Sequence, residues 1–319
     1  MSRRNLRRVL VSAPYFQPVV GRFRKVFAEA DIELVVPPVK ERLSEEELSA
    51  LISDVDGVIC GDDQFTEQVL EGAPRLKVIS KWGTGVDSID RQAAARLGIA
   101  VCNTPNAFTD AVADSVMGYI LCFARQIPWV NHDMRRNQWV KRPCVSLREC
   151  TLGIIGVGNI GKAVAQRAAA FGVRLLGNDV VEISSQWTSK TGMHTVGKEE
   201  LLRQADFVSL NCDLNPKSFH LISQRELGWM KPAACLINTA RGPLIDEPAL
   251  VRALQRKQIA AAALDVFEEE PLPADSPLRS LDNVLLAPHN ANSSPLAWEH
   301  VHENTVRQLL EQLSIPVSR

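Results

Sequence analysis

Short apolar runs alternate with longer polar segments along the N-terminal third of the chain. The polar segments carry helix-start patterns: Ser44 and Glu47 have the spacing of a capping box, and Thr66 and Asp90 can each cap a helix. The apolar runs span residues 9–11, 32–36, 58–60, 78–79 and 99–101. Strands that alternate with helices in this way predict an α/β fold with a parallel sheet.

The same alternation returns in the second half of the chain. It follows a long helix, expected from about residue 109 to 125, whose apolar side chains recur at helical period. The later strand-length runs span residues 152–155, 173–176, 207–210, 235–238, 261–266 and 284–286. A final helix is expected at about 296–313. A chain of 319 residues exceeds one average domain, so we expect two α/β domains.

The domain boundary is expected at Asn103-Thr104-Pro105, which interrupts the first series and is a candidate hinge. If the final helix packs back onto the N-terminal half, the first domain is discontinuous. We therefore predict a smaller, flavodoxin-like α/β domain made of residues 1–103 and 292–319. Residues 104–291 would form the second domain.

A glycine-rich turn lies where the first strand of the second series must pass into a helix. The segment Gly156-Val157-Gly158-Asn159-Ile160-Gly161 has the pattern G-x-G-x-x-G, which alone is weak because a structural tight turn also produces it. Here an apolar run precedes the turn and an Ala-rich helical segment follows. Gly156 permits the turn, Gly158 lets backbone N–H groups approach a pyrophosphate, and Gly161 lets the helix pack on the strand. The segment predicts a Rossmann-type doubly wound parallel sheet that binds a dinucleotide.

Asp179 indicates which dinucleotide is bound. It follows the next apolar run, and its distance from Gly161 is close to the roughly 20 residues expected for an acid that binds the adenosine ribose. A carboxylate accepts hydrogen bonds from both ribose hydroxyls and repels a 2′-phosphate. NAD is therefore favoured over NADP.

Charge and cysteine content narrow the possible binding partners and the possible cellular compartment. The chain has 36 basic and 37 acidic residues, so its net charge of −1 creates no field that would attract nucleic acid or an anionic membrane. The basic start at residues 2–8 lacks the apolar core of a signal peptide and is expected to be a solvated end. No run approaches the roughly 18 apolar residues that cross a bilayer. The seven scattered cysteines form no C-x-x-C pair, and the histidines are dispersed, so we expect free thiols in a reducing cytoplasm and no metal site.

Arg241, Glu270 and His289 follow three different predicted strands. Each alone has a plain explanation: an arginine in a polar loop, a member of an acidic run and a turn histidine. Open parallel sheets bind ligands at the carboxyl ends of their strands, so the three side chains are expected near the dinucleotide. Hydride transfer to a carbonyl needs an anion clamp, a proton donor and a group that orients the donor, and these residues can supply them.

The chain resembles the D-isomer-specific 2-hydroxyacid dehydrogenases, in the branch of phosphoglycerate, glycerate and hydroxypyruvate dehydrogenase-like enzymes. The resemblance covers nearly the whole chain and includes the glycine turn. Its other matching segments, in order, are residues 83–90 (GTGVDSID), 103–105 (NTP), 111–114 (AVAD), 238–242 (NTARG), 263–272 (ALDVFEEEPL) and 288–289 (PH).

The resemblance implies a catalytic role for each of the three residues. Arg241 would bind the carboxylate and carbonyl oxygen of a 2-oxo acid, and His289 would be the general acid/base, paired with Glu270. The chemistry agrees, because an imidazolium can donate a proton as the alkoxide forms, which contributes about 10²–10⁴ in rate. The Glu270 carboxylate would orient the ring and favour its cationic form. The arginine fork matches a carboxylate and cannot lose its proton.

The resemblance also implies binding residues and an assembly. Asp265 would contact the nicotinamide side of the cofactor, and Thr239 would belong to the cofactor site. The substrate carboxylate would be held by the backbone amides of Thr84, Gly85 and Val86. The discontinuous domain would be the substrate domain, with a cleft between it and the NAD-binding domain. D-stereochemistry and a homodimer, with the helix after Thr109 at its interface, follow from the resemblance alone.

Other functions remain open at this point. Formate-dehydrogenase-like enzymes lack the glutamate partner of the histidine, whereas Glu270 is present here. The C-terminal-binding corepressors keep this fold, NAD and the three residues while acting mainly through protein contacts, and the sequence does not exclude such a role. Phosphoglycerate dehydrogenase proper is a further alternative. Rapid NADH oxidation with some 2-oxo acid would favour an enzyme over a binding protein.

The chain departs from the family pattern in several places. Asp114 replaces the usual glutamate, and residues 211–215 and 290–294 also differ from the family. Asp62 and Asp63 stand where phosphoglycerate dehydrogenases carry an arginine that helps to hold the substrate phosphate. Unless they point to water, two carboxylates there would repel a dianionic phosphate, so we expect a non-phosphorylated, glyoxylate- or hydroxypyruvate-like substrate. The chain ends without the regulatory domain that some relatives append, so no built-in effector site is expected.

Overall fold

The structure, a computed structural model, describes residues 6–314. The strands are β1 (Arg7–Val11), β2 (Ile32–Val35), β3 (Gly57–Cys60), β4 (Val78–Lys81), β5 (Ala100–Cys102), β6 (Thr151–Ile155), β7 (Arg174–Asn178), β8 (His194–Thr195), β9 (Phe207–Leu210), β10 (Cys235–Asn238), β11 (Ala261–Leu264) and β12 (Val284–Leu286). The α-helices are α1 (Arg24–Glu29), α2 (Glu45–Leu51), α3 (Glu67–Glu71), α4 (Arg91–Arg96), α5 (Thr109–Ala124), α6 (Ile127–Arg135), α7 (Asn159–Ala170), α8 (Ser185–Thr191), α9 (Lys198–Gln204), α10 (Gln224–Trp229), α11 (Glu247–Gln255) and α12 (Pro295–Gln312). Short 3₁₀ helices are η1 (Gln17–Phe23), η2 (Leu147–Glu149), η3 (Gly242–Leu244) and η4 (Pro277–Ser280).

The chain forms two compact units. Residues up to Phe108, together with those from Ser294 onward, make one unit, and Thr109–Ser293 make the other. We call them the discontinuous unit and the central unit. The sequence placed the corresponding boundaries at 103/104 and 291/292.

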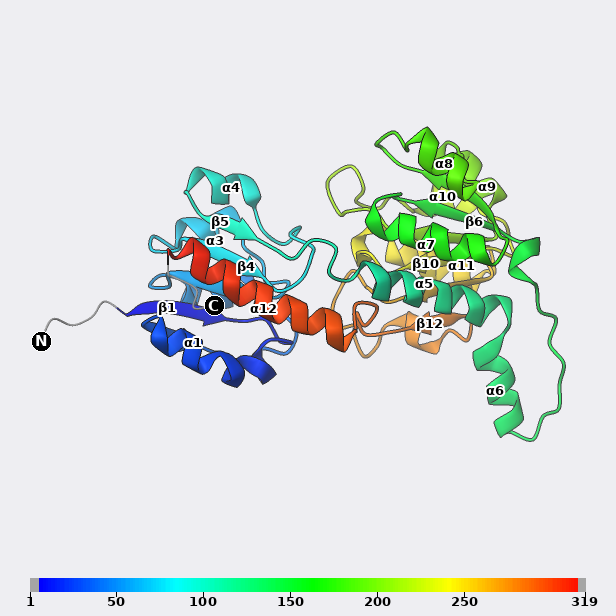
Figure 1. Cartoon of the computed structure of the whole chain (residues 1–319). Helices are drawn as coiled ribbons and strands as arrows, with labels where there is room; N and C mark the ends of the chain where they lie inside the picture. The colour runs from blue at the N-terminus through cyan, green and yellow to red at the C-terminus, as the bar shows by residue number, and fades with distance from the viewer. Residues whose placement is uncertain (1–5, 315–319) are drawn as a thin grey trace, which may run out of the picture. The chain divides into compact units, whose positions relative to one another are not determined.

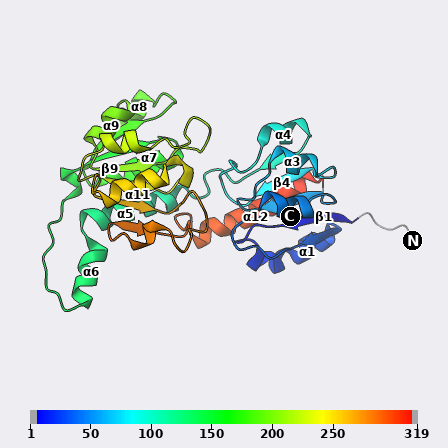
Figure 2. The same ribbon diagram turned by 180° about the vertical axis from the view of Figure 1, so that it is seen from behind.

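The discontinuous unit contains a five-stranded parallel sheet in the order β2-β1-β3-β4-β5, the order of flavodoxin-like folds. Side chains on one face, among them Leu10, Val58 and Ile79, pack with residues of α2, α3 and α4. Figure 2 shows α3 and α4 on this face. The helices begin where the sequence predicts: Ser44 and Glu47 make a capping box at α2, and the side chains of Thr66 and Asp90 cap α3 and α4.

Helix α12 covers the other face of this sheet, although it lies almost two hundred residues away along the chain (Figure 1, red). Ser80 in β4 donates a hydrogen bond from its hydroxyl to the carbonyl of Thr305, at 2.9 Å. Gly57 in β3 leaves room for Leu309, because a Cβ atom there would lie 2.9 Å from a methyl group of that side chain. The C-terminal segment is therefore part of the core of the unit that begins the chain.

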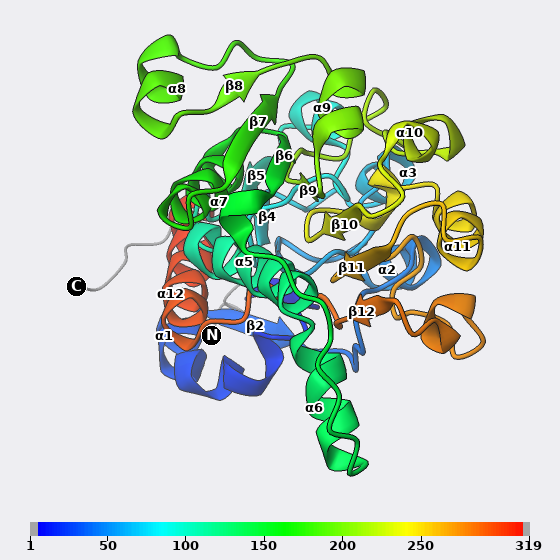
Figure 3. The same ribbon diagram turned by 90° about the vertical axis from the view of Figure 1, so that its right-hand side faces the viewer.

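The central unit contains a seven-stranded parallel sheet in the order β12-β11-β10-β9-β6-β7-β8. Chain order reverses at β6, and this is the topology of the dinucleotide-binding fold. Residues of α5 and α7 pack on one face of the sheet, and residues of α9, α10 and α11 pack on the other. Figure 3 shows both layers. The prediction of a Rossmann-type doubly wound sheet together with a flavodoxin-like α/β sheet is therefore confirmed.

Strand β8 and helix α6 are among the elements of the central unit that were not predicted. The edge strand β8 has exposed side chains and pairs only through Leu176–His194 and Gly177–Thr195, so it lacks an apolar pattern. Helix α6 carries few buried residues, and its sequence gives no apolar stripe facing the sheet. It projects from the rest of its unit in Figures 1 and 3.

The structure bears on the basic start of the chain, on membrane-spanning helices and on the cysteines. Of the basic start, residues 2–5 lie outside the described residues, while Arg7 and Arg8 belong to β1. Among the described helices, none combines the length and the apolar character that crossing a membrane requires. All seven cysteines carry free thiols, as expected.

Candidate active site

The glycine-rich turn connects β6 to α7 at the point where chain order reverses in the central sheet. Gly156 has a φ of +87°, which L side chains rarely adopt. A Cβ atom at Gly161 would lie 2.1 Å from the carbonyl oxygen of Gly156, so the helix can approach the strand only without a side chain here. At Gly158, by contrast, a Cβ atom would meet nothing within 4 Å. Of the three glycines in the turn, Gly158 is the one that faces open space, where it leaves the backbone accessible to a ligand.

The amino terminus of α7 fits a pyrophosphate. Gly158 is the N-cap, and no side chain caps the helix. Helix α7 is 12 residues long, so the first-turn N–H groups and the helix dipole present a positive end at the glycine turn. The backbone N–H groups at the start of α7 are therefore the kind of donors that bind the pyrophosphate of a dinucleotide.

Asp179 lies directly after β7, beside the glycine turn. Its Oδ2 accepts a hydrogen bond from the N–H of Val157 at 2.6 Å, and its Oδ1 accepts one from the N–H of Val181 at 2.9 Å. The neighbouring Val180 side chain is fully exposed. Two backbone donors thus fix the carboxylate, and each of its oxygens keeps a lone pair for a ribose hydroxyl.

His289 and Glu270, which come from loops after two adjacent strands, meet in the central unit. His289 Nδ1 lies 2.9 Å from Glu270 Oε2, and both side chains are one-fifth exposed. The other carboxylate oxygen of Glu270 accepts a hydrogen bond from the N–H of Phe267 at 3.0 Å. The Glu270 carboxylate is therefore held at both oxygens, one by the Phe267 N–H and one by the imidazole Nδ1.

Arg241 follows β10, the strand next to β11 in the same sheet. Its own loop is braced by Asn238, whose amide group donates to the Arg241 carbonyl at 2.8 Å and accepts from the N–H of Ala240 at 3.1 Å. One guanidinium nitrogen, Nη1, donates to the Ala240 carbonyl at 2.9 Å. Thr239, the residue between strand and loop, is buried. The loop therefore fixes the backbone at the base of the Arg241 side chain.

Asp265 lies at the end of β11 and is fully buried. Its two oxygens accept hydrogen bonds from the N–H groups of Asn290 and Ala291, each at 2.8 Å, and its carbonyl accepts from the N–H of His289 at 2.7 Å. Burial raises the pKa of Asp265, while these backbone N–H groups and the nearby His289 act to lower it. The family resemblance implied only a cofactor contact for Asp265. Its hydrogen bonds to the loop at residues 289–291 were not predicted.

Tyr119 in α5 is a second residue that sequence reasoning missed. Burial raises the pKa of Tyr119, and the nearby Asp265 carboxylate acts in the same direction. A tyrosine among apolar residues on the buried side of a predicted helix needs a partner for its hydroxyl, and this pattern could have identified it.

The discontinuous unit carries the loop at residues 83–86, directly after Trp82. The carbonyl of Gly83 accepts from the N–H of Thr104 at 2.8 Å, and the hydroxyl of Thr84 donates to the Thr104 carbonyl at 3.0 Å. Within the described part of the chain, the backbone N–H groups of Thr84, Gly85 and Val86 have no recorded acceptor. They are therefore available for a carboxylate.

The sequence offered two alternatives for Asp62 and Asp63, free carboxylates or side chains that point to water. The structure shows neither arrangement. Asp63 is completely buried, where it accepts from the Ser12 hydroxyl at 2.6 Å and from the N–H groups of Leu43 at 2.6 Å and Gly61 at 3.1 Å. Asp62 forms an ion pair with Lys81 instead of standing free. Asp63 accepts hydrogen bonds from three chain segments, and the charge of Asp62 is neutralised by Lys81. Neither carboxylate is therefore simply solvated, and neither presents an uncompensated charge.

The departure at Asp114 also has a local partner. Its carboxylate pairs with the guanidinium of Arg167 on α7 at 2.6 Å, and Asp110 binds the same guanidinium at 2.8 Å. Both carboxylates are mostly exposed, so they join α5 to α7 at the surface of the central unit. The usual glutamate is replaced here by a shorter acid that still reaches the arginine.

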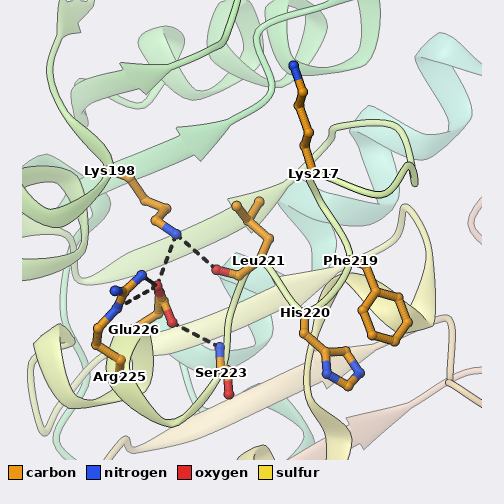
Figure 4. A pocket seen from close by; sticks show the side chains of 8 residues that line it. All are labelled: Lys198, Lys217, Phe219, His220, Leu221, Ser223, Arg225 and Glu226. Carbon is orange, nitrogen blue, oxygen red and sulfur yellow. Dashed lines mark hydrogen bonds and ion pairs between the residues drawn. The ribbon is translucent and has the colours of Figure 1, made fainter.

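A hollow of about 460 Å³ lies elsewhere in the central unit, between α9 and α10 (Figure 4). Its cations are largely engaged: Lys198 donates to Glu226 at 3.0 Å, and Arg225 donates to the same carboxylate at 2.8 Å. Figure 4 shows these three side chains turned toward one another, whereas Lys217 points away from them. None of the predicted site residues lines this hollow.

Comparison with known proteins identifies the family of the chain. The family model described as "D-isomer specific 2-hydroxyacid dehydrogenase, NAD binding domain" matches residues 117–291. A glyoxylate reductase of Thermofilum pendens is 41% identical over 85% of this chain and 82% of its own length. A D-3-phosphoglycerate dehydrogenase of Methanocaldococcus jannaschii is 40% identical over 90% of this chain, which spans only 54% of that protein.

Solved structures agree with the sequence comparisons. The crystal structure of D-lactate dehydrogenase from Aquifex aeolicus, complexed with NAD and lactic acid, matches 98% of this chain and all of its own, with a TM-score of 0.83 and 28% identity. The chain described here carries the NAD-binding domain of this group and is an NAD-dependent oxidoreductase. It belongs to the D-isomer-specific 2-hydroxyacid dehydrogenase family.

Proposed function

We propose that the protein interconverts a 2-oxo acid and its D-2-hydroxy acid, with His289 as the general acid/base, Glu270 as its partner and Arg241 as the carboxylate clamp. The observation that carries this proposal is the 2.9 Å contact between His289 Nδ1 and Glu270 Oε2. This contact can orient the imidazole and stabilise its cationic form, because Nδ1 is held by a carboxylate.

The proposed reduction needs one proton and one hydride. NADH, held by the glycine turn and Asp179, would supply the hydride that reduces the carbonyl carbon. His289 donates its Nε2 proton to the carbonyl oxygen, which becomes the hydroxyl of the product. The Glu270 carboxylate stabilises the imidazolium before the transfer, and the neutral ring is reprotonated from solvent.

The proposed role of Arg241 in binding the substrate carboxylate follows from the chemistry of its guanidinium and from the hydrogen bonds that fix its loop. A guanidinium offers parallel N–H donors that match the two oxygens of a carboxylate, and it stays charged at any pH at which the fold survives. Asn238 fixes the backbone of the arginine loop through two hydrogen bonds. In the discontinuous unit, the N–H groups of Thr84, Gly85 and Val86 remain our candidates for binding a substrate carboxylate.

We propose a substrate without phosphate, of the glyoxylate or hydroxypyruvate kind. The loop that follows β4 begins at Trp82, whose ring lies 5.5 Å from that of Tyr15 and 5.8 Å from that of Trp298, between centroids. Tyr15 and Trp298 are themselves 5.2 Å apart. Lys81 directly precedes Trp82, but its charge is taken up by Asp62. The described surroundings of the loop are therefore aromatic and charge-compensated, which suits an uncharged substituent better than a dianion.

NADH oxidation tests the proposed function directly. The purified protein should be assayed with 2-oxo acids of increasing size, with and without phosphate, and product configuration should be determined. Turnover of at least one non-phosphorylated 2-oxo acid to the D-product supports the proposal. Tight NADH binding without turnover across the panel would contradict it and favour a binding protein, and a phosphorylated substrate would indicate phosphoglycerate dehydrogenase proper.

We further propose that the protein is a homodimer that works in the reducing cytoplasm. Helix α6 and the segment after it expose large apolar side chains, of which Trp139 is 84% exposed and Ile127 and Met134 about half exposed. Exposed apolar clusters of this kind are typical of association surfaces. The seven free thiols suit a reducing compartment. Sedimentation of the wild type and of Trp139→Ser tests the dimer.

A further inference from the structure

The loops that carry Arg241 and Glu270 touch each other in the central unit. Directly after Arg241, a Cβ atom at Gly242 would lie 1.9 Å from the carbonyl carbon and oxygen of Phe267. The two backbones can pack this closely only because position 242 has no side chain. Phe267 also donates its N–H to Glu270 Oε1 at 3.0 Å. The place of the arginine relative to the His289–Glu270 pair therefore depends on what holds these two loops together.

Glu268, the residue after Phe267, joins the loops through a reciprocal pair of hydrogen bonds. Its Oε1 accepts from the N–H of Glu247 at 3.1 Å, and its own N–H donates to Glu247 Oε2 at 3.2 Å. Glu247 is the first residue of α11, where the loop of Arg241 ends. Each glutamate thus uses one backbone N–H and one carboxylate oxygen to bind the other.

His220 adds a third segment to this junction. Its ring nitrogen Nε2 lies 2.8 Å from Glu268 Oε1, and its backbone N–H donates to the Pro243 carbonyl at 2.8 Å. Because an ionised carboxylate can only accept, Nε2 is the donor. The ring stacks on that of Phe219, with 4.0 Å between centroids (Figure 4). His220 thus binds the arginine loop with its backbone and the Glu270 loop, through Glu268, with its side chain.

We propose that Glu268 is a positioning residue, which joins the loop of Arg241 to the loop of Glu270 and so places the carboxylate clamp relative to the proton donor. The inference rests on the proposed roles of Arg241, Glu270 and His289. A 2-oxo acid must contact the guanidinium and the imidazole at the same time, and a misplacement of about 1 Å can cost about 10²-fold in rate. Glu268 itself needs no contact with the substrate, because its hydrogen-bond partners belong to the protein.

The hydrogen bonds of Glu268, rather than its charge, carry this role. Burial raises the pKa of Glu247, the N–H of Glu268 acts to lower it, and the charges of Glu268 and Glu269 act to raise it. The negative charge of Glu268 is therefore unfavourable for its neighbour, whereas its Oε1 accepts two hydrogen bonds. A glutamine at this position keeps such an acceptor without the charge.

Glu268→Ala and Glu268→Gln test the proposal together. With the best 2-oxo acid from the panel, Glu268→Ala should lower kcat/KM by roughly tenfold or more, through a higher KM as well as a lower kcat, with NADH affinity nearly unchanged. Glu268→Gln should recover most of this loss. A Glu268→Ala enzyme with the kcat/KM of the wild type, or a glutamine variant as impaired as the alanine variant, would overturn the proposal.

Glu269→Ala is the matched control. It removes an exposed glutamate at the next position, whose charge also acts on Glu247, but it leaves the hydrogen bonds of Glu268 in place. The control should behave as the wild type. An equal loss of kcat/KM in Glu269→Ala and Glu268→Ala would show that charge, not the junction, is responsible and would contradict the inference.

His220→Ala provides a milder change and completes a double-mutant cycle. It removes one of the two donors to Glu268 Oε1, so kcat/KM should fall by less than in Glu268→Ala. In the Glu268→Ala background, His220→Ala should add little further loss, since the acceptor is already absent. Fully additive losses would mean that the two side chains act separately, and the proposed junction would then be wrong.

Hydrogen exchange keeps the test independent of turnover. The backbone N–H of Phe267 donates to the Glu270 side chain, and that of His220 donates to the arginine loop. In the NADH complex, both should exchange at least about tenfold faster in Glu268→Ala than in the wild type or Glu269→Ala. Unchanged exchange at either amide overturns the inference. If the wild type reduces no 2-oxo acid, the proposed function fails, while the exchange result still decides whether Glu268 joins the two loops.

Discussion

Lys81 Nζ lies 2.9 Å from Asp62 Oδ1, and only 4% of the lysine side chain is exposed. The pair stands at the carboxyl ends of β3 and β4, next to the loop with the candidate carboxylate donors. An almost completely buried ammonium requires a counter-ion, and Asp62 provides it. The cation closest in sequence to that loop is therefore already neutralised.

This ion pair predicts discrimination against phosphorylated substrates. We expect kcat/KM for hydroxypyruvate to exceed that for 3-phosphohydroxypyruvate by tenfold or more, about 1.4 kcal/mol. Asp62→Asn should release the charge of Lys81 and shift this ratio toward the phosphorylated compound. Steady-state kinetics with both compounds checks the prediction, and a wild type that prefers 3-phosphohydroxypyruvate would contradict it.

Cofactor choice should depend on Asp179. In the variant Asp179→Ser with Val180→Arg, a carboxylate that repels a 2′-phosphate is replaced and an attracting guanidinium is added at a fully exposed position. The ratio of kcat/KM for NADH to that for NADPH should fall by at least about a hundredfold. The assignment of Asp179 is wrong if the wild type already uses NADPH as well as NADH.

The contact between Glu270 and His289 should set the pH range of reduction. Reduction needs the imidazolium, which the Glu270 carboxylate stabilises, so Glu270→Gln should move the alkaline limb of kcat to lower pH. His289→Ala should lower turnover by at least about 10² with NADH binding nearly intact. The kcat profile is measured from acidic to alkaline pH, and an unchanged alkaline limb in Glu270→Gln would count against the pair.

Asp63 should matter for stability more than for selectivity. Asp63→Ala removes the common acceptor of Ser12, Leu43 and Gly61 and leaves their donors buried, which should lower the free energy of unfolding by about 3–5 kcal/mol. Glu46→Ala, at an exposed position of α2, is the control and should change it by less than about 0.5 kcal/mol. Chemical denaturation of both variants checks this, and equal midpoints would show that Asp63 is not structural.

His302 should make the discontinuous unit sensitive to acid. Its Nδ1 accepts from the indole Nε1 of Trp82 at 2.9 Å, and burial lowers the pKa of His302, with Arg22 acting in the same direction and Glu299 against it. A histidine whose folded pKa is depressed contributes stability that is fully present above its unfolded value of about 6.5 and is lost as pH falls from there through the folded pKa. The melting temperature should therefore drop between pH 7.5 and 5.5.

His302→Asn isolates this contribution, since asparagine can still accept from Trp82 but does not titrate. The variant should lose less stability than the wild type over the same pH interval. Asp63 and Asp265, whose pKa values burial raises, act in the opposite direction and are common to both proteins. Parallel melting curves against pH would exclude His302 as the origin of the acid sensitivity.

The sequence was sufficient for the elements with strong periodicity. The strands of both sheets are short apolar runs between caps and glycines, and the three capping residues Ser44, Thr66 and Asp90 act where predicted. Helix α6 was missed because it buries few side chains, and β8 because its side chains are exposed. Periodicity reports burial against a sheet, so elements without such burial leave no pattern.

The parts of the candidate site that were missed depend on pairs far apart in sequence. A pattern shows that Asp62 and Asp63 follow a strand, but not that Lys81, Ser12 and Leu43 lie beside them. The same holds for Asp265, whose two backbone donors belong to Asn290 and Ala291 in the loop after the next strand. Sequence identifies residues that can react, whereas the residues that hold them are recognised only when the fold brings them together.

Helix α12 has a consequence for the way this protein is made. Ser80 and Trp82, in the first of the two units, find their partners on a helix that is synthesised only after the whole central unit. The central unit is continuous and can close as soon as it emerges from the ribosome, whereas the first unit must wait with one face of its sheet uncovered. During synthesis, the strands of the discontinuous unit therefore precede the central unit but are completed after it, and their uncovered face is the surface that a chaperone would protect.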